Sequence, residues 1–310
     1  MDMLKIHFLN TIWSDAIILE KNNHYAFIDT GSKFYYPMIQ SYLNEHNIQK
    51  IDFILLTHFH NDHYGNVANI VHDYKVDKLY LKRYYGLDGT TSSGYSSNDE
   101  YIENEFKNYY EIINTCNMKY TNIIFIDELG VDEFDIDFHG TILETYDIKN
   151  RLNDIYNNKE SIYYKQKKFN ENFNCLGVFI EEKGFNIFLG ADVTCSSTDI
   201  IELKELSYKM VKRIYEKHNI NHIEIYKSCH HGGGGTNTPK LCNLLKAKYV
   251  VITNTSKWLD NYDTFDNLKT ANCDVEILKT DYYKYIFEIS DNISYEKIKE
   301  DSLFITLGKK

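Results

Sequence analysis

Three histidines and one aspartate lie within six residues of this chain, at His58, His60, Asp62 and His63. They directly follow Ile51–Leu56, a continuous apolar run that predicts a buried strand. Imidazole nitrogens and carboxylate oxygens are ligands for divalent metals such as zinc. Side chains two positions apart on an extended chain point the same way, so His58 and His60 are expected to bind one metal. Asp62 and His63 begin the next turn and are expected to face a second metal.

Two later positions could contribute to the same site. Asp192 follows the apolar run 187–189 and a Gly-Ala pair, and His230 and His231 precede four consecutive glycines at 232–235. Adjacent histidines on a loop point in different directions, so one is expected to bind metal and the other to contact a substrate oxyanion. The glycines allow the backbone to approach an anionic ligand closely. The residues alone leave open which histidine binds the metal.

His-x-His-x-Asp-His is the signature of the metallo-β-lactamase superfamily, and the chain resembles that superfamily from end to end. The resemblance implies an α/β fold, a four-layer αβ/βα sandwich that holds two metal ions between its sheets. It implies that Asp192 bridges the metals and that a metal-bridging hydroxide is the nucleophile. Asp29, which ends an early strand, is expected to support the ligands from behind. Two zinc ions are the expected cofactors, with manganese or iron as alternatives.

The superfamily commonly carries one more histidine between the cluster and Asp192. His72, His139 and Cys175 lie in that interval, and all three are interpreted as structural. A missing ligand leaves a coordination position for substrate, which is typical of catalytic rather than structural metal sites.

A narrower resemblance is densest over residues 5–84 and continues more loosely through 190–192, 226–231 and 252–258. These segments look like the catalytic domain of surface phosphorylcholine esterases, which remove phosphorylcholine from teichoic acid at a two-zinc site. By this resemblance His231 binds metal and His230 contacts phosphate. The esterases carry another histidine and an aspartate where this chain has Gly232 and Gly233, so retention of a choline pocket stays open.

Aromatic side chains in loops after the site-bearing strands are candidates for binding the quaternary ammonium of choline. Tyr84 and Trp258 are named for this role. Both follow strands that lead toward the predicted metal site.

The predicted function is a binuclear zinc phosphodiesterase acting on phosphorylcholine-type or related phosphodiesters, small or polymer-linked. Asp62 would hold metal and orient the nucleophile, and His230 would absorb charge on the phosphoryl oxygens. A nuclease resembling the DNA-uptake competence domain, which shares the His-His-Gly ending, is the alternative enzyme. A non-catalytic binding or sensor module is the alternative of another class. The net charge of −11 disfavours nucleic acid as a partner.

The elements that must position these residues alternate between strands and helices, which favours layered α/β packing. One domain is predicted over residues 1–310, with insertions near 84–122 and 146–174. The second insertion is expected to be an irregular loop, and residues 197–218 are expected to form one helix. No run approaches the roughly 18 apolar residues of a membrane helix, and no signal peptide is visible. A cytoplasmic location is therefore expected, or an extracellular one if a signal was removed.

Overall fold

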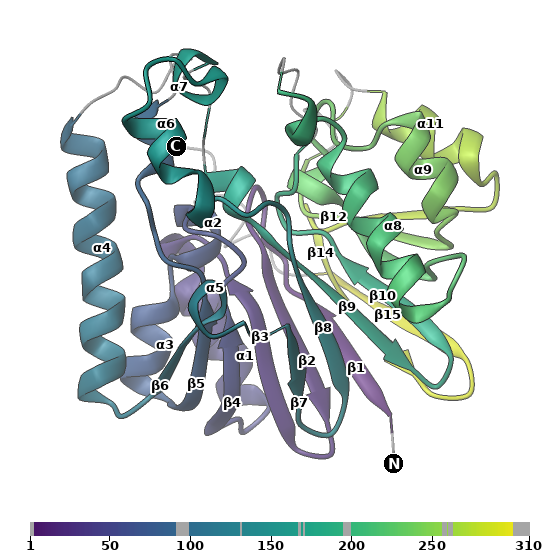
Figure 1. The fold of residues 1–310 in the computed structure, drawn as a ribbon. Helices are drawn as coiled ribbons and strands as arrows, with labels where there is room; N and C mark the ends of the chain where they lie inside the picture. Colours follow the sequence, from purple (N-terminus) through teal and green to yellow (C-terminus); the bar gives the residue numbers. More distant parts are fainter. Residues whose placement is uncertain are drawn as a thin grey trace.

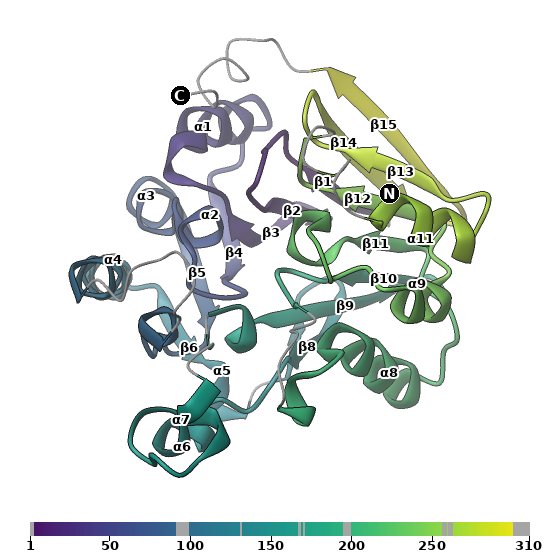
Figure 2. The ribbon, with the colours of Figure 1, turned by 90° about the horizontal axis from the view of Figure 1, so that it is seen from above.

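The fold consists of two β-sheets packed face to face, with helices on both outer sides (Figure 1). The computed structural model describes residues 3–90, 99–130, 132–166, 169, 171–194, 200–255, 259 and 263–299. Figure 2 shows helices α1, α3 and α4 on one side of the sheets and α8, α9 and α11 on the other. The predicted four-layer αβ/βα sandwich is therefore confirmed.

The first sheet has eight strands in the order β15-β14-β1-β2-β3-β4-β5-β6. Its strands β3 to β6 run parallel, whereas β15, β14, β1, β2 and β3 pair antiparallel. The strands are β1 (Leu4–Phe8), β2 (Ala16–Lys21), β3 (His24–Thr30), β4 (Lys50–Leu55), β5 (Lys75–Leu81), β6 (Asn122–Phe125), β14 (Tyr283–Ile289) and β15 (Ile293–Lys299).

The second sheet has seven strands in the order β13-β12-β11-β10-β9-β8-β7. Strands β10 to β13 are parallel, and β7 to β10 are antiparallel. The strands are β7 (Glu133–Asp135), β8 (His139–Glu144), β9 (Leu176–Glu182), β10 (Phe185–Leu189), β11 (Ile225–Lys227), β12 (Tyr249–Ile252) and β13 (Glu276–Lys279).

The helices cover the outer faces of the sheets through apolar stripes. Short helices connect the strands near the upper end of the sandwich in Figure 1. The α-helices named here are α1 (Tyr36–Glu45), α2 (Asn61–Tyr64), α3 (Val67–Asp73), α4 (Asp99–Met118), α5 (Ile126–Leu129), α6 (Leu152–Tyr156), α7 (Ile162–Gln166), α8 (Leu206–His218), α9 (Pro239–Leu245) and α11 (Thr264–Ala271).

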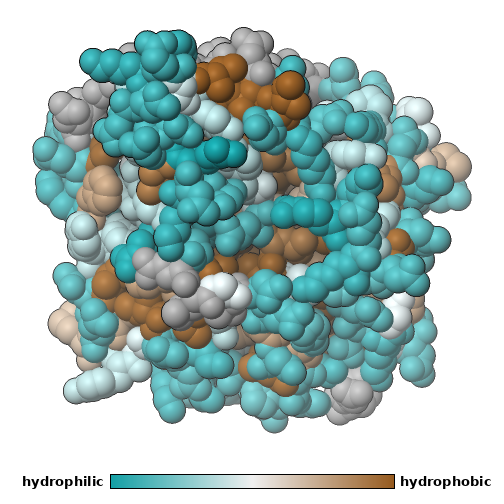
Figure 3. All heavy atoms as spheres, viewed as in Figure 1, coloured by the Kyte–Doolittle hydropathy of each residue, from teal (hydrophilic) through white to brown (hydrophobic). Residues whose placement is uncertain are grey.

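Strand β9 shows why the sequence forms this sandwich. Leu176, Val178 and Ile180 alternate along it and enter the core between the two sheets. Phe179 points the other way and joins the core beneath α8. A strand that is apolar on both faces must be covered on both faces, and the second sheet accordingly lies between the first sheet and a helical layer. On the face drawn in Figure 3, hydrophilic side chains predominate and the apolar ones gather in a few patches between them.

Two expectations about local structure are corrected. Helix α8 begins at Leu206 instead of near residue 197, because Glu205 has a φ of 54°, a left-handed conformation that an α-helix does not contain. The segment 146–174 is more ordered than an irregular loop, since it forms α6, α7 and the 3₁₀ turns 149–151 and 171–174. The segment 84–122 contributes helix α4, which packs beside α3. In the described part of the chain, no helix is long and apolar enough to cross a bilayer.

Candidate metal centre

The first group of metal donors lies where β4 leaves the sheet. The Thr57 amide donates to Asp29 Oδ1 at 2.8 Å, and its hydroxyl donates to Asp29 Oδ2 at 2.7 Å, which anchors this turn to the end of β3. The chain bends at His58 and Phe59 and is extended at His60, whose φ is −111° and ψ 147°. His58 Nε2 and His60 Nδ1 lie 3.0 Å apart, so the two imidazoles face one another.

The second group forms where α2 turns the chain back. His231 Nε2 lies 3.2 Å from Asp62 Oδ2 and 3.4 Å from Asp192 Oδ1. His63 Nε2 lies 3.3 Å from the same Asp192 oxygen. The four ligand atoms are all within 4.8 Å of one another, although the residues come from three distant parts of the chain.

Asp192 belongs to both groups. Its Oδ1 faces His63 and His231, whereas its Oδ2 lies 3.9 Å from His58 Nε2. The structure thus places this carboxylate between the two sets of donors, as expected for a bridging ligand.

These donors fit divalent metal ions. His63 Nε2 and Asp192 Oδ1 are buried and have no hydrogen-bond partner among the described residues. Orphaned polar atoms in a protein interior are costly unless something binds them. Imidazole and carboxylate lone pairs that converge in this way suit zinc, and also manganese or iron.

The outward nitrogen of each donor histidine is held by another side chain, which leaves the inward nitrogen available for metal. His63 Nδ1 donates to Asp29 Oδ2 at 2.7 Å, the supporting role predicted for Asp29. His60 Nε2 lies 3.3 Å from Asp88 Oδ1. His231 Nδ1 donates to Thr253 Oγ1 at 2.8 Å, and that hydroxyl donates to Asp15 Oδ1 at 2.6 Å.

Asp15 and Lys227 form a buried ion pair that sequence reasoning missed. The Lys227 ammonium contacts Asp15 Oδ2, donates to the Ala191 carbonyl at 3.1 Å and lies 3.9 Å from Asp192 Oδ1. Burial opposes its charge, but the carboxylates of Asp15 and Asp192 outweigh that effect and raise the pKa of Lys227. A lysine at the end of the apolar strand β11 was the available signal, since such a charge needs a buried partner.

The electrostatics of the second group favour charged carboxylates. Burial alone would raise the pKa of Asp192, but His231, His63 and His230 hold it well below its usual range. Conversely, burial opposes protonation of His63, whereas Asp192 and Asp29 raise its pKa well above the ordinary value. Protons and metal ions therefore compete for the same lone pairs.

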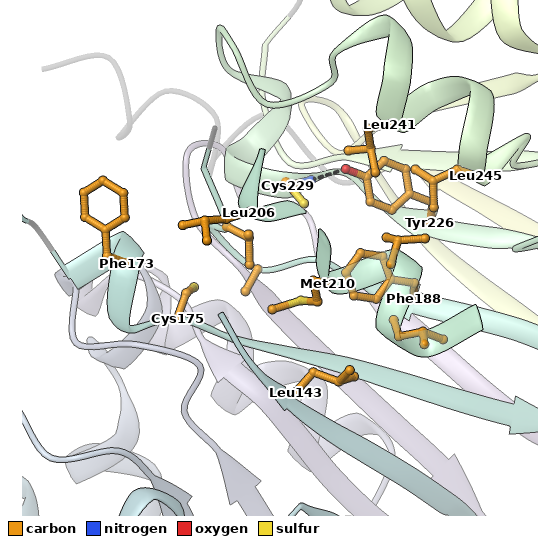
Figure 4. Close-up of a cluster of buried hydrophobic side chains, with 14 of the residues drawn as sticks. Leu143, Phe173, Cys175, Phe188, Leu206, Met210, Tyr226, Cys229, Leu241 and Leu245 are labelled. Atoms are coloured by element: carbon orange, nitrogen blue, oxygen red, sulfur yellow. Dashed lines mark hydrogen bonds between the residues drawn. The ribbon is translucent and has the colours of Figure 1, made fainter. Parts of the chain in front are cut away.

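His230 stands apart from both groups, on a strained turn. The Cys229 amide donates to the Tyr226 hydroxyl at 2.8 Å (Figure 4), and the His230 amide donates to the Ala191 carbonyl at 2.8 Å. His230 and His231 both have left-handed backbones, with φ of 47° and 51°. This turn directs the two imidazoles differently.

The exposed edge of His230 faces the first donor group. Its Nε2 lies 3.8 Å from Asp192 Oδ2 and 3.4 Å from Asn172 Nδ2, and the side chain is 39% exposed. Burial among its neighbours lowers the pKa of His230, which favours a neutral imidazole.

The three residues in the interval of the missing histidine contribute no donor to either group. Cys175 Sγ lies behind His58, 3.4 Å from its Nδ1, and accepts from the Asp192 amide at 3.3 Å. His72 is exposed beside Asp73. His139 is on β8, and its Nε2 lies 3.9 Å from Oε1 of Glu133 on β7. All three have the structural placement that was expected.

Tyr84 and Trp258 were the aromatic candidates for binding choline. Tyr84 lies in the loop after β5 but is only 5% exposed and packs on Phe59 and Phe106. Its ring is part of the core beneath α4, so the expectation that it contacts substrate is corrected. Trp258 lies outside the described residues.

Comparisons with known proteins agree with this architecture. The family model of the metallo-beta-lactamase superfamily matches residues 14–140. A search of curated proteins finds no match. The metallo-beta-lactamase fold protein YhfI from Bacillus subtilis is 12% identical, with a TM-score of 0.53 over 93% of this chain and 100% of that one.

A second solved structure gives the same result. Tm1679, described as a metal-dependent hydrolase of the beta-lactamase superfamily, is 12% identical, with a TM-score of 0.52 over 96% of this chain and 100% of that one. At such identity these two likenesses show the fold alone. None of these findings supports the narrower resemblance to the phosphorylcholine esterases or to the DNA-uptake domain.

Proposed function

We propose that the chain is a binuclear metal-dependent phosphodiesterase of the metallo-beta-lactamase superfamily, whose family model matches residues 14–140. Its proposed substrates are phosphorylcholine-type or related phosphodiesters, and its proposed metals are two zinc ions. His58 and His60, whose Nε2 and Nδ1 atoms lie 3.0 Å apart, would hold one metal. His63 and His231, whose Nε2 atoms lie 3.3 and 3.4 Å from Asp192 Oδ1, would hold the other.

The position of Asp192 is the observation that supports the proposal most directly. One carboxylate reaches both groups of histidine nitrogens, through a different oxygen on each side. Two donor groups that share a carboxylate suit a pair of divalent metals. Two metals bound there would supply a nucleophilic hydroxide near neutral pH and would neutralise charge on the phosphoryl oxygens.

The protein's own side chains have separate roles in this proposal. Asp62 completes the second donor group and is 25% exposed, so it borders the space that substrate would enter. His230 is partly exposed beside Asp192, so its imidazole would contact a phosphoryl oxygen as negative charge develops there. Asp15, Asp29 and Asp88 are buried and would hold the donor histidines in place.

The substrate class is proposed from charge as well as from resemblance. The chain has a net charge of −11, which disfavours long polyanions and favours a small or locally neutral phosphodiester. A nuclease would need local contacts to the phosphates that outweigh the repulsion between this negative charge and a nucleic acid.

One assay on zinc-loaded protein tests the proposal. It compares the hydrolysis of p-nitrophenyl phosphorylcholine with that of bis(p-nitrophenyl) phosphate, and mass spectrometry counts the bound metals. Two metals per chain and a higher kcat/KM for the choline ester are expected. Equal or reversed rates would instead indicate a general phosphodiesterase or a nuclease. Hydrolysis of neither ester by a protein with two bound metals would refute the proposal.

A further inference from the structure

A cavity of about 370 Å³ lies between helices α2, α3 and α4 and the 3₁₀ turn 33–35. Asn61 and Tyr64 of α2 line this cavity. Asp62 and His63, which lie between them in the sequence, belong to the second donor group. None of the proposed metal donors is among the residues described around the cavity, so it is a space separate from the candidate metal centre.

The wall formed by the turn 33–35 is held against α2 by the protein itself. Gly65 ends α2, and a Cβ atom at this position would lie only 2.3 Å from the Lys33 amide nitrogen. Asn66 Nδ2 donates to the Ser32 carbonyl at 2.8 Å. These contacts fix the turn to the start of α3, so the cavity is formed before any ligand binds.

Helix α4 presents hydrogen-bond acceptors to the cavity. Glu105, Asn108 and Glu111 line it at successive intervals of three residues. The Tyr64 hydroxyl donates to Glu105 Oε2 at 2.7 Å. Asn108 Nδ2 donates to the Tyr64 hydroxyl at 2.9 Å and to Glu105 Oε1 at 3.4 Å. Because these two bonds use both N–H groups of Asn108, its Oδ1 remains as an acceptor.

The carboxylates of this row have no counter-charge among the described residues. Glu105 is only 5% exposed, and its hydrogen-bond donors are neutral groups. No described lysine, arginine or histidine nitrogen lies within 4.0 Å of the carboxylate of Glu105 or Glu111, although Lys33 also lines the cavity. Burial raises the pKa of Glu105. Since buried carboxylates are rare without a cation beside them, a cationic ligand would supply what the described neighbours lack.

Other lining side chains are apolar. Phe34 is 41% exposed, and Ala68 and Ile112 line the same cavity. These groups offer a surface to the methylene groups of a ligand, whereas an inorganic cation could not use them. The cavity therefore suits a molecule that carries both ammonium and aliphatic groups.

We propose that this cavity binds a linear aliphatic diamine or polyamine. Its ammonium groups would donate to Glu105, Asn108 Oδ1 and Glu111, and its methylene groups would contact Phe34 and the α3 wall. Three residues of helix rise about 4.5 Å, a spacing that three or four methylenes between nitrogens can bridge. The net charge of −11 also favours a cationic ligand. This inference does not depend on the proposed phosphodiesterase activity.

Calorimetric titration with spermidine tests the inference on the full chain, at a salt concentration of roughly 0.15 M. Wild type should bind it saturably at one site, and Glu111→Gln should raise Kd at least about 5-fold. Glu103→Gln is the matched control, because it removes the same charge from an exposed position of α4 outside the cavity. It should change Kd less than about 2-fold. Equal effects of the two variants, or no saturable binding by wild type, would overturn the inference.

Two further titrations test the place of binding. Phe34→Ala should raise Kd for spermidine about 3- to 10-fold, whereas Tyr120→Ala, at a 94% exposed position outside the cavity, should leave it unchanged. An unchanged Kd in Phe34→Ala would contradict binding in this cavity. Titrations with and without bound zinc should agree, because none of the proposed metal donors lines the cavity. Binding that requires zinc would place the amine on the metal and would overturn the inference.

Discussion

Glu171 is predicted to make the stability of the fold depend on pH. It lies in the 3₁₀ turn 171–174 before β9, and its side chain is fully buried. Its amide donates to Asp88 Oδ1 at 3.3 Å, its Oε2 accepts from Asn174 Nδ2 at 3.1 Å, and its Oε1 has no hydrogen-bond partner among the described residues. Burial, and then the charge of Asp88, raise the pKa of Glu171 from 4.5 to about 7.

The sign and size of the effect follow from this shift. Between pH 4.5 and about 7 the folded protein keeps a proton on Glu171 that the unfolded chain releases, so stability falls as pH rises through this window. Above the folded pKa the loss is complete. The rise of the Glu171 pKa from 4.5 to about 7 corresponds to a loss of about 3 kcal/mol in the free energy of unfolding, at roughly 1.4 kcal/mol per pH unit.

Glu171→Gln should remove this dependence, because the amide keeps a similar shape and carries no charge. The free energy of unfolding is measured by urea denaturation of wild type and variant at pH 5 and pH 8. The stability of the variant relative to wild type should increase by about 2.5 kcal/mol between the two pH values, because part of the loss is already present at pH 5. Taking the difference cancels the titration of the groups that do not interact with Glu171, which both proteins share.

Glu160→Gln is the matched control, because the Glu160 side chain is 92% exposed. Its stability relative to wild type should change by less than about 0.5 kcal/mol between the same pH values. A Glu171→Gln variant whose difference from wild type is the same at pH 5 and pH 8 would refute the reasoning.

Three further predictions concern the candidate metal centre. Asp62→Asn should lower phosphodiester hydrolysis at least about 100-fold while the thermal unfolding curve stays unchanged. Asp274→Asn, at an exposed position, should leave hydrolysis unchanged. Near-normal turnover in Asp62→Asn would contradict the role of Asp62. His231→Ala should reduce the metal content measured by mass spectrometry below two per chain, and an unchanged content would remove His231 from the ligand set. Lys227→Met should destabilise the fold by about 3–5 kcal/mol in urea denaturation, because it leaves Asp15 buried without its cation, and adding Asp15→Asn should restore part of that loss. No recovery in the double variant would show that the ion pair is not the cause.

The sequence alone determined the local parts of the site and the class of fold. The spacing of His58 and His60 on an extended chain predicted two imidazoles on one side, and the structure brings their nitrogens to 3.0 Å. The alternation of strands and helices, with the superfamily signature, predicted the sandwich. These features depend on neighbours a few residues apart, so periodicity and spacing are enough to reveal them.

The supporting residues became visible only in the tertiary structure. Asp15 accepts a hydrogen bond from the Thr253 hydroxyl, and these two residues are 238 positions apart in the sequence. His231 lies beside Asp62, from which it is 169 positions apart. Conversely, Tyr84 had the right position along the chain but points into the core. The sequence records which residues are near one another along the chain, whereas sheet pairing and packing between the sheets decide which distant side chains share one low-dielectric site.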